Sequence, residues 1–207
     1  VWKSPSSMVF STIDRVERLR TSPPVTNTNL LAGQTSNPKY AYFNLHGLPD
    51  AVEWFGQRDP TEPAGGDDFP LALRPEDIGA AAANGRPQPV PWVIFSEACY
   101  GAHIADKTQD QSISLKFMTS GARAFVGSTG ISYGSISTPL IAADLLGRIF
   151  WGLLEEGFQA GEALRRAKLN LVREMHRRQG YLDPEDQKTI ISFVLYGDPL
   201  AQPYPLQ

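Results

Sequence analysis

The chain has 207 residues, of which 42% are hydrophobic and 20% are charged, which is typical of one globular domain with a sizeable core. Its formal net charge of -3 provides no positive field for nucleic acid, and no apolar run is long enough to span a bilayer, so we expect neither a nucleic-acid nor a membrane partner. The single cysteine, Cys99, excludes an intramolecular disulfide and a zinc site made of four cysteines.

Residues 1–39 form a polar arm ahead of the predicted domain, which covers residues 40–207. Within the arm, the segment from Ser11 to Arg20 predicts a short helix, whereas the segment from Thr21 to Pro38 has the composition of a loop. Because the chain begins at Val1 and not at a methionine, we expect that a segment upstream of it has been removed.

The rest of the chain alternates between apolar runs and amphipathic segments. Strands are predicted at residues 40–45, 91–96, 124–128 and 190–196. Helices are predicted from Arg74 to the stop at Asn84-Gly85, around residues 112–120, and where apolar faces run from Ala142 to Leu153 and from Ala160 to Met175. The stretch between residues 48 and 73 is rich in Gly, Pro and Asp and is predicted as a loop. This alternation predicts an α/β fold with a parallel sheet that helices cover on both faces.

Two of the predicted strands end at residues with reactive side chains. His46 follows the first strand, and Cys99 follows the second. Because the carboxyl ends of neighbouring parallel strands lie at one edge of the sheet, a thiol and an imidazole there can form a catalytic dyad. The backbone N–H groups of Gly47 and Cys99 would then face a developing oxyanion. The spacing alone equally allows two unrelated residues, a hydrogen-bonded histidine and a buried thiol.

The motifs around these residues resemble those of the caspase-like cysteine peptidases. They are Tyr42-Phe43-Asn44-Leu45-His46-Gly47 and Glu97-Ala98-Cys99-Tyr100-Gly101, and the closing segment from Phe193 to Pro199 is similar to that of gingipain-type peptidases and CHAT domains. The resemblance implies a three-layer α/β/α sandwich with a mostly parallel central sheet. It also implies a cysteine endopeptidase that acts on peptide or protein substrates, with His46 and Cys99 as its dyad and Gly47 in the oxyanion hole.

The resemblance is incomplete at the N-terminus. Such folds place two further strands before the histidine strand, and residues 1–39 do not predict both of them. We therefore expect these strands to be missing or to lie on a companion chain. No cofactor is expected, and the acidic pair Asp67-Asp68 lacks the ligand spacing of a calcium site, so no metal site is predicted.

Glu97 is the acidic residue that bears most on specificity. In the resembled peptidases this position often lines the pocket for the side chain before the cut bond, and an acid there accompanies cleavage after Arg or Lys, through a charge-assisted hydrogen bond. The alternative is a strand-end carboxylate that binds backbone or a local arginine. After the third strand, Ser128, Thr129 and Tyr133 are candidates for pairing with an extended substrate, or else form a plain turn.

Two other classes of function remain open. The segment Gly130-Ile131-Ser132-Tyr133-Gly134 fits the G-x-S-x-G nucleophile elbow of serine hydrolases, for which Asp144 and His176 would complete the triad. Such an elbow needs a strand directly before it and a helix that starts at the serine. The other class is a catalytically silent caspase-like scaffold for protein interaction, which the presence of both His46 and Cys99 disfavours.

Overall fold

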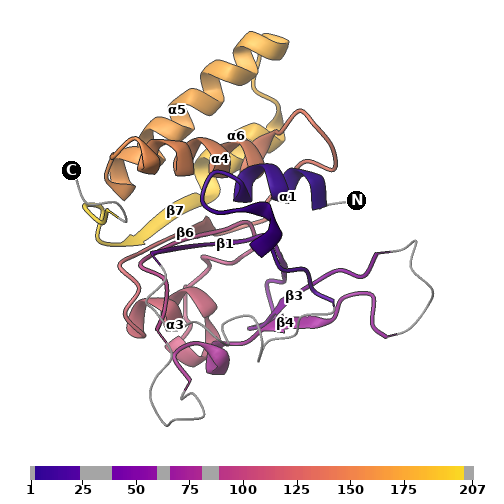
Figure 1. Cartoon of the computed structure of the whole chain (residues 1–207), viewed down its shortest axis with the longest axis vertical. Helices are drawn as coiled ribbons and strands as arrows, with labels where there is room; N and C mark the ends of the chain where they lie inside the picture. Colours follow the sequence, from indigo (N-terminus) through magenta and orange to yellow (C-terminus); the bar gives the residue numbers. More distant parts are fainter. Residues whose placement is uncertain (1–2, 24–38, 60–65, 81–88, 203–207) are drawn as a thin grey trace.

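The computed structural model describes residues 3–23, 39–59, 66–80 and 89–202. A four-stranded sheet at its centre has the strand order β1-β5-β6-β7 (Figure 1). The pairings β1–β5 and β5–β6 are parallel, and β6–β7 is antiparallel. The α/β class and the mostly parallel sheet are therefore confirmed. The strands span Tyr40–Phe43 (β1), Val93–Ser96 (β5), Ala124–Ser128 (β6) and Phe193–Gly197 (β7).

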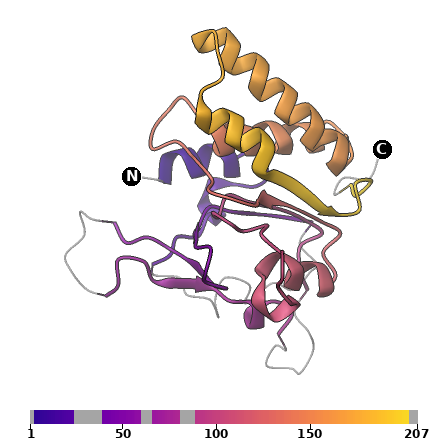
Figure 2. The same cartoon turned by 180° about the vertical axis from the view of Figure 1, so that it is seen from behind.

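Helices lie on both faces of this sheet, which makes three layers (Figures 1 and 2). Every residue of β5 and β6 is buried, as expected for strands that are covered on both sides. Val93 and Phe95 belong to the core on the side of α4 and α5, whereas Ile94 belongs to the core on the side of α3. The α3 side also holds the short turns η2 (Pro75–Asp77) and η3 (Gln109–Gln111). The helices are α1 (Lys3–Phe10), α3 (Ile113–Thr119), α4 (Ala142–Glu155), α5 (Ala160–Gln179) and α6 (Pro184–Ser192).

A second, smaller sheet lies beside the end of β1 and was not predicted. It joins β2 (His46–Gly47), β3 (Trp54–Phe55) and β4 (Leu71–Leu73) in antiparallel order. The ring of Trp54 packs against Phe43 and Phe125 at centroid distances of 5.6 and 6.3 Å, which anchors the small sheet to the main one. The prediction of a loop over residues 48–73 is therefore wrong where β3 and β4 form.

The N-terminal arm contains a helix at a different place from the one predicted. Helix α1 precedes the predicted segment, which contains turns and the 3₁₀ turn η1 (Val16–Arg18). The reason lies in packing, because Val9 and Ile13 are buried in the core beside α4. The predicted loop from Thr21 to Pro38 lies outside the described residues from position 24 onward.

Two other predicted boundaries are also corrected. Where a helix was predicted from Arg74, the described residues form only η2, and Gly79 follows with a φ of +70° that a helix does not allow; residues 81–88 lie outside the described part. The predicted strand at 190–196 begins only at Phe193, because α6 continues through Ser192. The strands at 124–128 and the two long helices are confirmed, as is the helix at α3.

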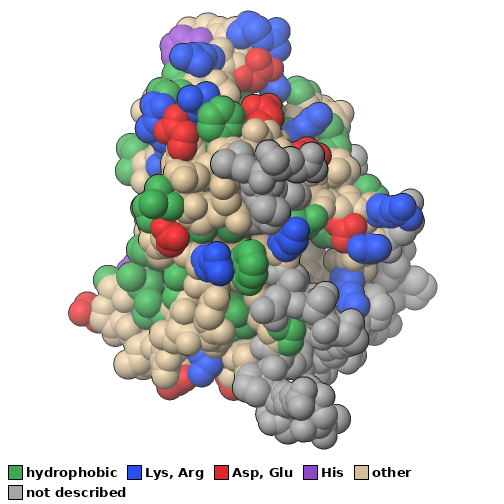
Figure 3. Space-filling view, turned by 60° about the vertical axis from the view of Figure 1, so that its left-hand side comes forward, with side chains coloured by type: hydrophobic (Ala, Val, Ile, Leu, Met, Phe, Trp, Pro, Cys, Tyr) green, Lys and Arg blue, Asp and Glu red, His purple; other side chains and the backbone are tan. Residues whose placement is uncertain are grey.

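The exposed side of the helical layer carries charges of both signs, interspersed over the upper part of Figure 3. On α5, Glu162 pairs with Arg165 and Arg166, and Glu174 pairs with Arg177 and Arg178. These hydrogen bonds lower the pKa of each glutamate to about 2. None of the described helices combines the length and the apolar composition of a membrane span.

Candidate active site

Cys99 lies in the turn that directly follows β5, at the carboxyl end of the parallel strands. The turn is held by a hydrogen bond of 2.7 Å from the Tyr100 N–H to the Gly130 carbonyl. Tyr100 has a φ of +56°, an uncommon conformation for an aromatic residue that is concentrated at functional sites. The half-buried Cys99 sulfur lies between the backbone N–H of Ser132, at 3.3 Å, and the carbonyl of the same residue, at 3.6 Å.

His46 begins β2 and is half-buried at the edge of the small sheet. Its backbone pairs with Phe55, and its ring meets the ring of Phe69 edge-on at a centroid distance of 5.1 Å. Its Nε2 atom lies 3.0 Å from Oε1 of Gln57, which follows β3. The Phe69 ring and the Gln57 amide therefore both contact the imidazole.

Gly47 brings the histidine segment against the cysteine turn. A Cβ atom at position 47 would overlap the carbonyl oxygen of Cys99 and would lie 3.4 Å from the side chain of Ala98. The buried backbone of Gly47 thus packs directly on that of Cys99, and only glycine permits this approach. The structure brings together the segments that carry His46 and Cys99, although one belongs to the small sheet and the other follows a strand of the main sheet.

Glu97 is buried, with 6% of its surface exposed, and its partners lie within the protein. The Tyr42 hydroxyl donates a hydrogen bond of 2.9 Å to its Oε1 atom. Burial, followed by the negative charge of Asp144, raises the pKa of Glu97 well above its ordinary value. Burial also raises the pKa of Asp144, although the Ser135 N–H donates to this carboxylate. The alternative reading of Glu97 named a backbone or arginine partner, and the partners observed are a phenol and a second acid.

The carboxyl groups of Glu97 and Asp144 lie close enough to interact, and this interaction raises the pKa of Glu97. The segment between β6 and α4 covers the pair. A Cβ atom at Gly134 would lie 2.7 Å from an Asp144 oxygen and 3.8 Å from a Glu97 oxygen. The same segment holds the cysteine sulfur through Ser132, so one stretch of chain covers both the thiol and the carboxyl pair.

The three residues predicted to pair with substrate are engaged within the protein. The Ser128 hydroxyl donates to the Gly130 carbonyl at 3.0 Å and lies 3.0 Å from the Ser192 hydroxyl. The N–H of Thr129 donates to the Ser192 carbonyl at 2.9 Å. The Tyr133 hydroxyl accepts a hydrogen bond of 3.0 Å from Lys188. Their role in substrate binding stays a prediction.

The arrangement required for a serine nucleophile is not formed. Ser132 lies in irregular backbone well after the end of β6, and α4 begins only at Ala142. His176 is an exposed residue of α5 whose Nδ1 atom lies 3.1 Å from the Val172 carbonyl of its own helix. The strand–turn–helix geometry that presents such a serine is absent from this described segment.

Gln57 escaped the sequence analysis, and Asp144 was named there only for a different role, as the acid of a serine triad. Gln57 lies in a stretch predicted as a loop, and no local pattern marks its contact with His46. Asp144 lies in the first turn of α4, where an acid is ordinary, and only the structure shows that it is 1% exposed beside Glu97. Among the residues that the structure describes, no three His, Cys, Asp or Glu side chains gather as a metal site.

Comparison with protein families identifies the chain. The profile of peptidase family C25 matches residues 75–204, which is more than half of the chain and includes Glu97 and Cys99. His46 precedes the matched region. A search of curated proteins returned no match to this chain. The mostly parallel α/β sheet, with a cysteine at the carboxyl end of its second strand, agrees with this match. The chain belongs to peptidase family C25, the gingipain family of caspase-like cysteine peptidases.

Proposed function

We propose that the protein is a cysteine endopeptidase with Cys99 as nucleophile and His46 as general base and acid, and that it cleaves after Arg or Lys. The observation that carries the proposal is the packing of the Gly47 backbone on that of Cys99, which leaves His46 adjacent to the cysteine turn. The family match supports peptidase chemistry for this cysteine.

In the proposed reaction, the sulfur of Cys99 attacks the peptide carbonyl carbon as the thiol proton passes to His46. The carbon–sulfur bond forms, and the carbonyl oxygen becomes an oxyanion. This intermediate collapses as the carbon–nitrogen bond breaks, and His46 donates its proton to the departing amine. Water, deprotonated by His46, then hydrolyses the thioester and releases the thiol.

The oxyanion needs N–H donors at the place where its charge develops. We assign this role to the backbone N–H groups of Gly47 and Cys99, whose residues pack against one another. Ser132 occupies the other side of the sulfur, and its segment has to yield part of this space when a substrate binds.

The preference for Arg or Lys follows from the acidic pair beside the nucleophile. Burial raises the pKa of both Glu97 and Asp144, which disfavours two negative charges side by side in this site. A substrate guanidinium or ammonium group can take the place of a proton between the two carboxylates, so that the site keeps the same net charge when the proton leaves. Because Glu97 is buried, the chain around Gly134 and Ser135 must move aside for this contact. Substrate binding would thereby release a proton and uncover the thiol.

The experiment that tests the proposal is peptide-library profiling of the wild type, Cys99→Ala and His46→Ala. We expect turnover only with the wild type, and Tm values of the variants close to that of the wild type, because loss of one sulfur costs on the order of 1 kcal/mol. Turnover by Cys99→Ala above about a tenth of the wild-type rate would exclude a covalent path through this residue. If the wild type and both variants are inactive on every peptide, the result would favour the scaffold function.

Specificity is tested on substrates with Arg, Lys, Asn, Asp or Leu before the scissile bond. The wild type should prefer the basic residues, and Glu97→Gln should lose about tenfold or more in kcat/KM on them while changing little on Leu. Preference for Asn or Asp would overturn the assignment of Glu97. If the wild type and Glu97→Gln prefer basic substrates equally, another acid provides the specificity.

A further inference from the structure

Gln57 is held against His46 by a rigid backbone. Its own N–H donates to the Ser22 carbonyl at 2.9 Å. On either side of it, the Gly56 N–H donates to the Pro70 carbonyl at 2.8 Å, and the Arg58 N–H donates to the Asp68 carbonyl at 2.9 Å. A Cβ atom at Gly56 would lie within 2.6 Å of the Ser22 side chain, so the chain here is tightly packed. The backbone that carries the Gln57 side chain is therefore held in place on both sides of the residue.

We infer that Gln57 is a positioning residue that sets the tautomer of His46. With Oε1 of Gln57 only 3.0 Å away, the imidazole is held with its proton on Nε2, which donates to that oxygen. The lone pair of Nδ1 is then the one available to take the thiol proton from Cys99. This inference rests on the proposed function, since it assigns the dyad's proton to one ring nitrogen.

An amide differs from a carboxylate in this position because it orients the ring without adding charge. A carboxylate would also stabilise the imidazolium form, as in peptidases with an acidic third residue. The ionisable groups on the elements packed around His46 are Cys99, the ion pair of Arg58 with Asp68, and Asp50 and Glu53 between β2 and β3. Because Gln57 is neutral, the net charge of the dyad depends only on the protonation of the thiol and of the imidazole.

The direct test is NMR of the ring nitrogens in the Cys99→Ala protein, whose chain contains only three histidines. We expect His46 to show a proton on Nε2, and Gln57→Leu to abolish that fixed tautomer. Gln57→Glu should move the titration midpoint of His46 upward by about 1 pH unit, because a carboxylate favours the imidazolium. A proton found on Nδ1, or an unchanged titration in Gln57→Glu, would overturn the inference whatever the enzyme's activity.

Kinetics give a second test with a control for the proposed function. Gln57→Leu should lower kcat by about tenfold or more at nearly constant KM, because orientation is lost and not binding. Gln57→Glu should recover most of kcat and shift one limb of the pH profile upward. Full activity of His46→Ala would defeat the proposed dyad itself. Loss of activity in His46→Ala, with wild-type rates and pH profile in both Gln57 variants, would defeat only the role of Gln57.

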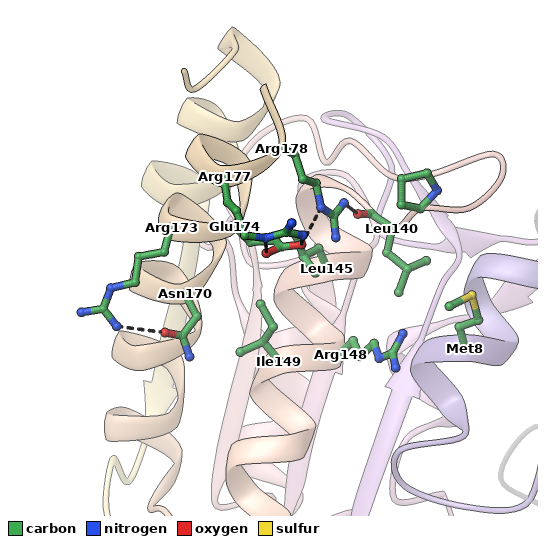
Figure 4. A pocket seen from close by; sticks show the side chains of 11 residues that line it. Met8, Leu140, Leu145, Arg148, Ile149, Asn170, Arg173, Glu174, Arg177 and Arg178 are labelled. Atoms are coloured by element: carbon green, nitrogen blue, oxygen red, sulfur yellow. Dashed lines mark hydrogen bonds and ion pairs between the residues drawn. The ribbon is translucent and has the colours of Figure 1, made fainter. Parts of the chain in front are cut away.

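A separate observation concerns a pocket of about 610 Å³ between α1, α4 and α5 (Figure 4). Its apolar surface includes Leu145 and Ile149 of α4, and Met8 of α1 lies at one end of it. The pocket is lined by a single acid, Glu174, and by four arginines: Arg148, Arg173, Arg177 and Arg178. Glu174 pairs with Arg177 and Arg178, whereas Arg148 and Arg173 have no acidic partner within the described residues.

We propose that this pocket binds an acidic peptide segment of a partner protein that also carries an apolar side chain. Charge complementarity selects this occupant, because the pocket is strongly positive on a chain whose net charge is -3. The lining extends from Arg173 past Ile149 to Met8, which suits an extended chain (Figure 4). Arg178 also donates to the Leu140 carbonyl at 2.6 Å, at the end of the segment that covers Cys99.

The test measures binding of a short fluorescent peptide of alternating Glu and Leu residues. Wild type should bind it, with affinity that falls as salt rises, and should not bind the same peptide with Gln in place of Glu. Arg148→Gln/Arg173→Gln should weaken binding by about tenfold. Arg165→Gln/Arg166→Gln makes the same charge change on α5 outside the pocket and should bind like wild type. The proposal would be overturned if both double variants lost the same binding affinity, or if the wild type did not bind the peptide. Tighter binding of an oligonucleotide than of the peptide would also overturn it.

Discussion

At the scale of single residues, the absence of a side chain at Gly47 determines how closely the two sheets approach at the site. The small sheet reaches the cysteine turn because nothing separates the Gly47 backbone from the Cys99 carbonyl. The twist of a few short strands alone would not produce so close a contact. The position of His46 therefore depends on its glycine neighbour as well as on its own strand.

We expect Gly47→Ala to lower kcat/KM by about 100-fold, because the added methyl group displaces the cysteine turn relative to His46. Overpacking at this buried position should also lower the free energy of unfolding by about 1–3 kcal/mol. Gly130→Ala is the matched control, since a Cβ atom there meets nothing within 4 Å. Equal effects of the two substitutions, in kinetics and in thermal denaturation, would contradict the role of the close approach.

The buried carboxyl pair makes stability depend on pH. Glu97 has a raised pKa in the folded protein and an ordinary value of 4.5 when exposed, so above pH 4.5 the folded chain holds a proton that the unfolded chain has lost. The stability of the wild type should therefore fall as the pH rises from 4.5 through the raised pKa. Glu97→Gln keeps a donor toward Asp144 without a proton to lose.

Tm measured between pH 4.5 and pH 8 should thus decline for the wild type and much less for Glu97→Gln. The exposed Glu156 provides the control, and Glu156→Gln should follow the wild-type curve. Parallel curves for wild type and Glu97→Gln would mean that the pair is ionised in the folded protein.

At the scale of elements, α6 shows how a capping residue at the start of a helix determines the secondary structure of the segment that follows. The run Ile190-Ile191 favours a strand through its β-branched residues, yet both residues lie in α6. The helix starts where the Asp183 side chain accepts a hydrogen bond of 2.8 Å from the Asp186 N–H, with Pro184 in the first turn. Its last residue, Ser192, then binds Thr129 at the end of β6.

Asp183→Ala should lower the free energy of unfolding by about 1 kcal/mol through loss of this cap. Urea denaturation gives the difference directly. Glu185→Ala removes an exposed acid from the same turn and should change stability by less than about 0.5 kcal/mol. A negligible effect of Asp183→Ala would show that packing of α6, and not its cap, starts the helix.

At the scale of the whole molecule, the N-terminal helix is part of the helical layer. Val9 is fully buried and Ile13 is 8% exposed, both within the core that α4, α5 and one face of the sheet share. In Figure 1, α1 lies beside α4 above the sheet. The arm therefore contributes apolar surface to the same core as the strands that precede the candidate site.

Val9→Ala should lower the free energy of unfolding by about 2 kcal/mol, because it leaves a small cavity between α1 and α4. Val16→Ala is the comparison, since Val16 is 43% exposed and should cost far less. A single cooperative transition for both variants would show that α1 unfolds with the rest of the domain. Destabilisation by Val16→Ala as large as that by Val9→Ala would contradict this packing.

The sequence by itself determined the central strands, the two long helices and the position of Cys99 directly after a buried strand. These features depend on periodicity and on apolar composition within one segment, which the chain carries locally. Only the tertiary structure decided the small sheet, the contact of Gln57 with His46 and the pairing of Glu97 with Asp144. Strands as short as β2 and β3 contain no measurable period, and both contacts join residues on different elements. Such contacts form when the core is buried, because a buried polar group without a partner costs free energy. The local sequence therefore contains no pattern that predicts which residues will pair.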